Sequence, residues 1–285
     1  MERILITGAS GFTGSKLVKL LQNKNYDNCK VFLTDVTEDL SHQNYVKCDL
    51  TSFDSVKLLL NEIKPTHIFN LAGTFSNEFL IDFNSNVIAV KNILDNLINA
   101  NLNAKILLIG SAAEYGNVKE IENPIIETHS LSPINLYGLT KVFQSNLMNY
   151  YVNKFDLDIV MARTFNIYGQ GISVKLFAGK IYEMIDMYKK NEIKKLSFYD
   201  LENLRDYIHI NDALNYYLEI MNFGIKGEVY NVGNGKPMTN RDLLKSILNE
   251  KGLKYNFINI QNTKSKNAEV KSIYADITKL KKLKS

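Results

Sequence analysis

The run Ile4-Leu5-Ile6 and the loop TGASGFTG at residues 7–14 that follows it decide the fold of this chain. The loop's glycines stand between this strand-like run and an amphipathic helical pattern that begins at Ser15. Glycine permits a tight turn and lets a pyrophosphate approach a helix N-terminus, where free N–H groups and the helix dipole favour an anion. The loop therefore predicts a dinucleotide site at the first strand–helix junction. Its contact residues are expected to be Gly8, Gly11, Phe12, Thr13 and Gly14.

Strand and helix patterns alternate through the first half of the chain. Strand-like runs cover 3–7, 30–34, 45–48, 67–72, 105–110 and 157–162, and helical patterns cover 15–23, 52–63, 79–100 and 136–154. This alternation predicts an α/β fold of the Rossmann type, a doubly wound parallel sheet with helices on both faces. After residue 163 the rhythm changes, and helices at 175–190, 211–222 and 240–251 are separated by short strands and loops.

The change of rhythm predicts two parts. Residues 1–163, with about 211–233, are expected to form the dinucleotide-binding domain. Residues 164–210 and 234–285 are expected to form a smaller C-terminal substrate-binding lobe over the C-terminal ends of the strands. Ligands of such sheets bind at those ends.

The second strand ends at Asp35, roughly 20 positions beyond the glycine loop, where an acidic residue holds the adenosine ribose hydroxyls. A carboxylate repels a 2′-phosphate, and neither Val36 nor Thr37 supplies a cation for one. The sequence therefore favours NAD(H), with NADP(H) as the alternative. Asp49 and Leu50 follow the third strand and are expected beside the adenine.

A hydroxyl, a phenol and an ammonium are supplied by SAAEYG at 111–116 and YGLTK at 137–141. Tyr137 and Lys141 are four positions apart, so on a helix they share one face. A lysine beside a tyrosine favours the phenolate, which lowers the pKa of the phenol toward working pH. Together with Ser111, the pair predicts a proton donor and acceptor for interconversion of a carbinol and a ketone.

Length and composition are typical of an enzyme with a large core. The chain has 285 residues, of which 45% are hydrophobic and 22% are charged. The net charge is only +4 and lies mainly in the lysine-rich tail, so binding of nucleic acid is not expected. Cys29 and Cys48 lack metal-ligand spacing, which predicts free thiols in the cytoplasm and no metal site. The sequence contains no apolar span long enough to predict a membrane-spanning segment.

These motifs resemble those of the extended short-chain dehydrogenases/reductases, in the NAD-dependent epimerase/dehydratase branch that modifies nucleotide sugars. The glycine loop, SAAEYG and YGLTK all match motifs of this family. In addition, NLAG at 70–73 resembles the strand that borders the nicotinamide. The segment SNVIAVKNIL at 85–94 contains the family's helix asparagine, here Asn86. Three later segments also resemble the family: ARTFNIYGQG at 162–171, RDYIHINDA at 205–213 and EVYNVGNG at 228–235. The resemblance covers nearly the whole chain.

The resemblance implies roles for particular residues. Ser111, Tyr137 and Lys141 would be catalytic, with Tyr137 exchanging a proton with a sugar oxygen while C4 exchanges a hydride with the cofactor. Asn166 and Arg205 would hold the substrate diphosphate, and Lys266 stands where similar proteins carry a further arginine. Leu71, Ala72 and Gly73 would border the nicotinamide. Arg163 is as well explained by a buried structural cation as by a ligand contact, and His209 is interpreted as structural.

The pattern is closest to reductases that form GDP-rhamnose from a GDP-4-keto-6-deoxy sugar, so a GDP-sugar is the favoured substrate. A nucleotide-sugar 4-epimerase is the alternative, and Asp35 favours it because epimerases retain NAD. The 4,6-dehydratases carry acidic groups after the catalytic hydroxyl, where this chain has Ala112 and Ala113. Dehydratase activity is therefore less favoured. A catalytically silent binding protein is also less favoured, because such a protein is expected to lack Tyr137 or Lys141 and both are present.

In similar proteins, helices equivalent to 79–100 and 136–154 pack across a homodimer. The first of these has more apolar residues than one buried stripe requires. They are Val87, Val90, Ile93, Leu94, Leu97 and Ile98. We therefore expect a homodimer.

Overall fold

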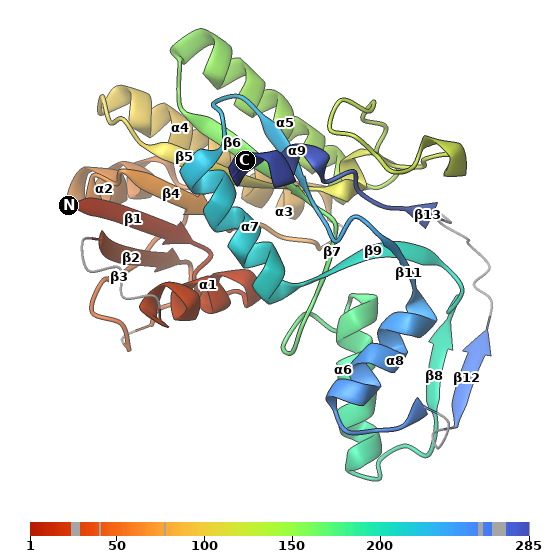
Figure 1. Cartoon of the computed structure of the whole chain (residues 1–285). Helices are drawn as coiled ribbons and strands as arrows, with labels where there is room; N and C mark the ends of the chain where they lie inside the picture. Colours follow the sequence, from red (N-terminus) through yellow and green to blue (C-terminus); the bar gives the residue numbers. More distant parts are fainter. Residues whose placement is uncertain (24–28, 40, 77, 256–258, 264–271, 285) are drawn as a thin grey trace.

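A computed structural model describes residues 1–23, 29–39, 41–76, 78–255, 259–263 and 272–284. Over these residues the central sheet has seven strands in the order β10-β6-β5-β4-β1-β2-β3, and every neighbouring pair is parallel (Figure 1). The strands are β1 (Glu2–Thr7), β2 (Cys29–Asp35), β3 (Tyr45–Lys47), β4 (His67–Asn70), β5 (Lys105–Ser111), β6 (Ile159–Thr164) and β10 (Val229–Val232). This order confirms the predicted Rossmann-type fold.

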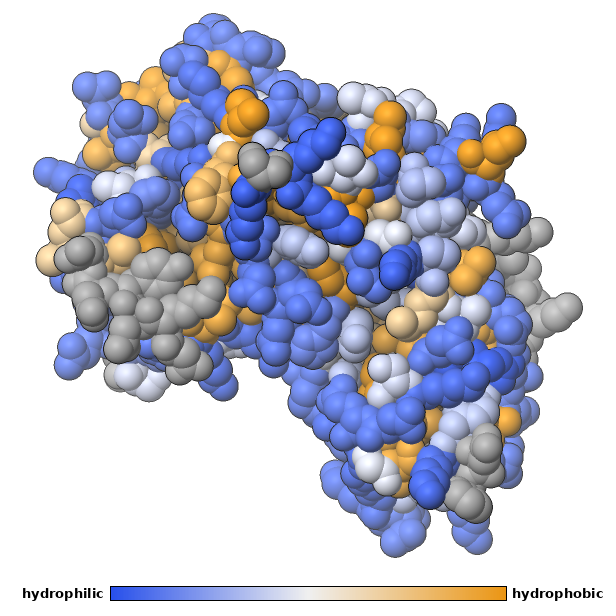
Figure 2. All heavy atoms as spheres, in the orientation of Figure 1, coloured by the Kyte–Doolittle hydropathy of each residue, from blue (hydrophilic) through white to orange (hydrophobic). Residues whose placement is uncertain are grey.

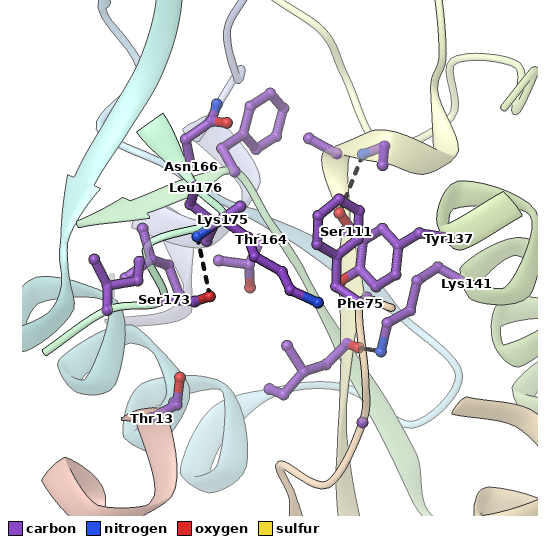
Figure 3. A pocket seen from close by; sticks show the side chains of 18 of the residues that line it. Thr13, Phe75, Ser111, Tyr137, Lys141, Thr164, Asn166, Ser173, Lys175 and Leu176 are labelled. Carbon is purple, nitrogen blue, oxygen red and sulfur yellow. Dashed lines mark hydrogen bonds between the residues drawn. The ribbon is translucent and has the colours of Figure 1, made fainter. Parts of the chain in front are cut away.

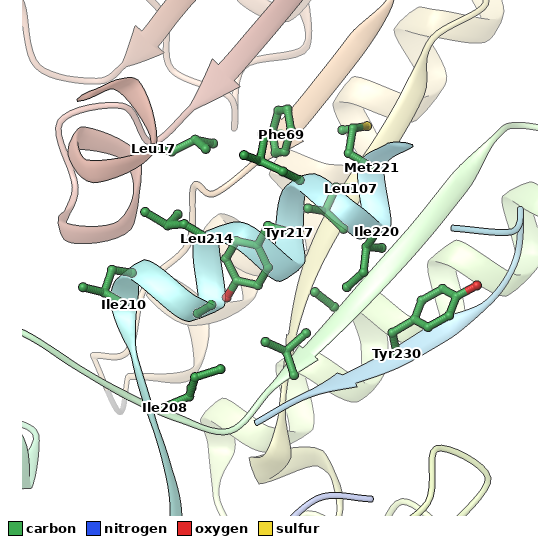
Figure 4. Packing of buried hydrophobic residues seen from close by; sticks show 14 of the residues in the cluster. Leu17, Phe69, Leu107, Ile208, Ile210, Leu214, Tyr217, Ile220, Met221 and Tyr230 are labelled. Atoms are coloured by element: carbon green, nitrogen blue, oxygen red, sulfur yellow. The ribbon is translucent and has the colours of Figure 1, made fainter. Parts of the chain in front are cut away.

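Helices cover both faces of the sheet. One face carries α1 (Phe12–Asn23) and α7 (Ile210–Phe223), and the other carries α2 (Phe53–Ile63), α4 (Ala89–Asn99) and α5 (Leu136–Phe155). Apolar side chains of α7 such as Leu214 and Ile220 are at most 1% exposed, and they pack with Leu17 of α1 and Leu107 of β5 (Figure 4). Each face of the sheet therefore has its own apolar core.

A smaller lobe stands out from the main body (Figures 1 and 2). It contains α6 (Phe177–Lys189), α8 (Asn240–Glu250) and the parallel pair β8 (Leu196–Tyr199) and β12 (Ile260–Thr263), around a third apolar core. Between the lobe and the main sheet lie β7 (Asn166–Tyr168), β9 (Leu204–His209), β11 (Pro237–Thr239) and β13 (Ser272–Ile273), and α9 (Thr278–Lys281) follows them. None of the helices in the described part of the chain is long and apolar enough to cross a membrane.

Two predicted helices differ in detail. The first begins at Phe12 and not at Ser15, so its first turn is made by the glycine loop itself. The predicted helix 79–100 is divided into α3 (Phe79–Phe83), a π-helical turn η1 (Asn84–Ile88) and α4. The π turn contains Asn86, whose buried amide hydrogen-bonds to Thr74 and Thr140, and these bonds offset the wider turn.

The apolar residues of the helix 79–100 pack inside the subunit. Val87, Val90, Ile93, Leu94 and Leu97 are at most 5% exposed, and Ile98 packs against the same core. The interpretation that they are too many for one buried stripe is therefore wrong, because the sheet and α2 cover them. Seven of the exposed apolar side chains lie instead on α3 and on α5. They are Phe79, Leu80, Ile81, Leu136, Phe143, Tyr150 and Phe155.

Candidate active site

A cavity of about 780 Å³ lies at the C-terminal ends of the central strands, where the small lobe faces the sheet (Figure 3). Loops that follow β1, β4, β5 and β6 line it, and residues 172–173, residues 175–178 and Arg205 line it from the lobe. Open parallel sheets bind ligands at the carboxyl ends of their strands, because the loops that follow neighbouring strands diverge there and leave a crevice. The cavity therefore brings together segments that are far apart in the sequence.

The glycine loop turns as the sequence predicts. Gly8 has φ +63°, and a Cβ there would lie 2.7 Å from the backbone nitrogen of Ala72. A Cβ at Gly14 would lie 2.1 Å from the Gly8 carbonyl oxygen. Any larger residue at either position would separate the loop from β4 or from α1. The loop thus fits a pyrophosphate at the N-terminus of α1, and Phe12 and Thr13 of the first turn line the cavity.

Asp35 lies beside this loop. Its carboxylate accepts hydrogen bonds from the Ser10 amide at 3.1 Å, the Ser10 hydroxyl at 2.6 Å and the Val36 amide at 2.7 Å. The carboxylate is therefore fixed at the end of β2, within reach of the loop that would hold the phosphates. This position fits the predicted contact with the adenosine ribose.

Of the other residues assigned to the cofactor, three line the cavity and two do not. Leu71, Ala72 and Gly73 line the cavity directly after β4. Asp49 and Leu50 do not line it. The Asp49 carboxylate accepts hydrogen bonds from the Thr51 amide and hydroxyl, and Leu50 is buried in the core under α2 and α4.

Ser111 ends β5, and a 3₁₀ turn, η2 (Ala112–Glu114), begins immediately after it. The serine hydroxyl caps this turn by accepting a hydrogen bond from the Ala113 amide at 3.2 Å. In return the Ser111 amide donates to a carboxylate oxygen of Glu114 at 2.8 Å. This reciprocal pair fixes the serine at the cavity wall.

Glu114 and Arg163 form a buried ion pair behind Ser111. Their side chains are 0% and 3% exposed, and the Arg163 Nη2 lies 2.9 Å from a Glu114 oxygen. Ser145 donates to the same carboxylate at 2.6 Å, and Arg163 also donates to the Tyr115 hydroxyl at 3.1 Å. Arg163 is therefore a buried structural cation and not a cavity residue. Glu114 likewise points away from the cavity, into this network.

Tyr137 and Lys141 lie on one face of α5, as predicted. The helix begins after Asn135, whose side chain accepts a hydrogen bond from the Gly138 amide at 2.7 Å. Both residues line the cavity, and Figure 3 shows them beside Ser111. The Lys141 ammonium donates to the Ile109 carbonyl at 2.9 Å and to Gln144 at 3.0 Å, and it lies 5.8 Å from the Tyr137 ring centroid.

The pKa of Tyr137 shifts opposite to the predicted direction. Burial raises this pKa to about 12, although a hydrogen bond with Ser111 partly lowers it. Burial lowers the pKa of Lys141 to about 8, while the charges of Glu114 and Asp82 raise it. The prediction considered the lysine charge and omitted desolvation, which is the larger effect here. Tyr137 is thus protonated at neutral pH, as a proton donor must be.

On the lobe side, Asn166 and Arg205 both line the cavity. The Asn166 amide donates to the Asp206 carbonyl at 3.1 Å, and the Arg205 guanidinium donates to the Leu204 carbonyl at 2.8 Å. Lys266 lies outside the described residues. His209 caps α7, since its Nδ1 accepts a hydrogen bond from the Asn211 amide at 3.3 Å.

Lys175 and Phe75 are among the cavity residues that the sequence analysis did not identify. Lys175 precedes α6, and its side chain reaches from the lobe into the cavity (Figure 3). Phe75, in the loop after NLAG, packs against Tyr137. The available signals were a lysine just before the first lobe helix and an aromatic residue two positions after Gly73. Neither pattern separates a cavity residue from a surface residue.

The chain matches known proteins over most of its length. The profile of the NAD-dependent epimerase/dehydratase family matches residues 4–233. A putative UDP-glucose 4-epimerase of Methanocaldococcus jannaschii is 27% identical, with 98% of this chain and 92% of that protein covered. A GDP-6-deoxy-D-talose 4-dehydrogenase of Aggregatibacter actinomycetemcomitans is 30% identical, with 82% and 74% covered. The structure of RMD from Pseudomonas aeruginosa complexed with NADPH matches with a TM-score of 0.86 at 24% identity, with 99% and 92% covered, which establishes the same fold.

Proposed function

The chain belongs to the NAD-dependent epimerase/dehydratase family, and from that premise we propose that it is a nucleotide-sugar 4-ketoreductase. Its substrate is a nucleoside diphosphate 4-keto sugar, with a 6-deoxy GDP-sugar favoured. Bound NAD(P)H supplies the hydride that reaches C4. The observation that carries the proposal is the joint placement of Ser111, Tyr137 and Lys141 in the cavity at the strand ends.

Each of these side chains has a role that fits its position. Tyr137 donates its phenolic proton to O4 of the sugar as the carbonyl is reduced. Ser111 donates a hydrogen bond to the same oxygen, and its hydroxyl is already oriented by the cap on η2. Lys141 lies on the same face of α5 as Tyr137, where it would hold the nicotinamide ribose and return a proton to Tyr137. The pKa of Lys141, lowered by burial to about 8, suits such a proton transfer near neutral pH.

The alanines after Ser111 argue against a 4,6-dehydratase. Ala112 and Ala113 line the cavity where an elimination would need an acid and a base, and their methyl groups transfer no proton. The nearest carboxylate along the chain belongs to Glu114, which is fully buried against Arg163. Elimination of water across C5 and C6 therefore lacks its acid–base groups.

The test is incubation with GDP-mannose and NAD⁺ in one reaction and with GDP-4-keto-6-deoxymannose and NADH or NADPH in another. We expect no change in the first and stoichiometric oxidation of the cofactor in the second. A product lighter by one water in the first reaction would identify a dehydratase. The second candidate, a 4-epimerase, is favoured by Asp35 and by the similarity to a putative UDP-glucose 4-epimerase. Exchange of C4 epimers without net consumption of cofactor would identify it.

Cofactor choice gives one prediction. The Asp35 carboxylate is fixed by Ser10 beside the ribose position, so NADH is expected to serve at least as well as NADPH. Asp35→Ala should raise kcat/KM for NADPH relative to NADH by roughly fivefold or more, because like charges 4 Å apart repel by about 1 kcal/mol even in water. Asp39→Ala removes a neighbouring exposed carboxylate and should leave the ratio unchanged. A strong preference of the unaltered protein for NADPH would contradict the assignment.

The diphosphate contact gives a second prediction. Asn166, Arg205 and Lys175 line the lobe side of the cavity, and we assign the diphosphate to them. Arg205→Lys keeps the charge and loses the forked geometry, so KM for the nucleotide sugar should rise about tenfold while cofactor affinity stays unchanged. Arg241→Lys, in an arginine that pairs with Glu202 outside the cavity, is the control. A fall in cofactor affinity would assign Arg205 to the other ligand.

We also propose that the protein is a homodimer that pairs through α3 and α5. Support comes from the apolar side chains exposed there, among them Leu80 at 70% and Ile81 at 45%. Exposed apolar groups that gather on neighbouring helices are typical of an interface. Sedimentation at micromolar concentration should give a dimer, and Leu80→Lys should shift it toward monomer. A monomeric unaltered protein would refute the proposal.

A further inference from the structure

Phe75 is an aromatic side chain of the cavity wall, in the loop that follows β4 and next to Tyr137. Its ring centroid lies 5.0 Å from that of Tyr137, with an interplanar angle of 82°, and Figure 3 shows the two side chains together. The residue is still 38% exposed and lines the cavity. Its ring therefore faces the space next to the phenol that meets the reacting oxygen.

The loop that carries Phe75 is held on both sides of this residue. Before it, the Thr74 amide donates to the Asn86 side chain at 3.0 Å and the Thr74 carbonyl accepts from the same side chain at 3.0 Å. After it, the Ser76 amide donates to Asp82 at 2.8 Å. The hydroxyls of Thr74 and Ser76 also donate to Asp82, each at 2.9 Å. Asp82 and Asn86 are at most 1% exposed, so these anchors are shielded from water.

The same anchor is joined to the helix that carries Tyr137. The Asn86 amide also donates to the Thr140 hydroxyl at 3.0 Å, and that hydroxyl donates to the Tyr137 carbonyl at 2.8 Å. Asn86 thereby sets the distance between the loop and α5. Phe75 and Tyr137 are positioned as a pair, as a specificity-determining group beside an acid–base group must be.

We infer that Phe75 selects a sugar whose C6 is a methyl group. The inference rests on the proposed function, in which Tyr137 meets O4. Of the two carbons next to C4, C3 carries a hydroxyl in ordinary sugars, whereas C5 carries C6, which is apolar when it is a methyl group. A methyl at C6 packs against the Phe75 ring, whereas a C6 hydroxyl there gives up part of its hydration against an apolar surface that offers it no hydrogen bond.

Binding to the NADH-loaded protein tests this directly. GDP-rhamnose of the D-series and GDP-mannose differ only at C6, and as C4 alcohols neither can react with a reduced cofactor. Calorimetry should give a Kd for the 6-deoxy sugar that is about 10- to 100-fold lower, which is the discrimination an apolar pocket achieves against one added hydroxyl. The matched pair on dTDP, with and without the C6 hydroxyl, covers a second base.

Three variants assign the effect to the ring. Phe75→Leu keeps an apolar wall and should retain the preference, whereas Phe75→Gln supplies a hydrogen-bond partner and should reduce it to within about threefold. Phe53→Leu is the control, since Phe53 is 39% exposed and does not line the cavity. Equal Kd values for the two sugars in the unaltered protein, or an unchanged preference in Phe75→Gln, overturn the inference. Selective binding without hydride transfer to a 4-keto sugar would overturn only the proposed reductase reaction.

Discussion

Tyr137→Phe should lower kcat for reduction of a 4-keto sugar nucleotide by roughly 10²–10⁴, because transfer of a proton by a positioned side chain contributes about that much. The variant loses only the phenolic oxygen, so its ring can still pack against Phe75. Binding of NADH, measured by calorimetry, should stay within about twofold, because the glycine loop and Lys141 are untouched. Stopped-flow absorbance of the reduced nicotinamide would measure the hydride step itself.

The control for this experiment is Tyr216→Phe. Tyr216 is a half-buried tyrosine of α7 that does not line the 780 Å³ cavity, so its hydroxyl should be dispensable for turnover. Near-normal kcat in Tyr137→Phe would refute the assigned role. Equal losses in both variants would indicate a general effect of removing a hydroxyl and not a proton transfer.

The order of the elements could be predicted from the sequence because each depends on local patterning. Short apolar runs alternate with amphipathic stretches, and only a parallel sheet with helices on both faces satisfies both. The turn of the glycine loop could also be predicted, because Gly8 and Gly14 stand where backbone atoms leave no room for a Cβ. The π turn at Asn86 could not be predicted, because it depends on hydrogen bonds to Thr74 and Thr140, which are distant in sequence.

The candidate site was predictable where a motif fixes both residue type and spacing, as for Tyr137 and Lys141. It was not predictable where tertiary packing decides. The direction of the Tyr137 pKa shift depends on burial, which no spacing reveals. Lys175 and Phe75 reach the cavity only because the lobe and the loop after β4 fold over it. Arg163 could be assigned only once β6 and η2 were placed side by side.

Glu114→Gln should lower the free energy of unfolding by about 3–5 kcal/mol, because it leaves Arg163 buried without its counterion. The amide is nearly isosteric, so the loss reflects charge and hydrogen bonding and not a cavity. Typical domains are stable by about 5–15 kcal/mol, so the variant would lose a large share of its stability. Urea unfolding measures this loss of stability: the midpoint should fall while the slope of the free energy of unfolding against urea concentration stays unchanged. Lys91→Met breaks the exposed Lys91–Asp95 pair and should cost less than about 1 kcal/mol.

The double variant Glu114→Leu with Arg163→Met decides whether the pair acts through its charges. Removing both charges avoids an unpaired buried ion, so it should be less destabilised than Glu114→Gln, although Ser145 and the Ser111 amide lose their acceptor. A loss in Glu114→Gln no larger than that in Lys91→Met would contradict a buried, water-excluded pair. Because Glu114 holds the Ser111 amide, the double variant should also turn over more slowly even where it is folded. A double variant that is more stable than Glu114→Gln but still has a lowered kcat would show that the pair positions Ser111 in addition to stabilising the core.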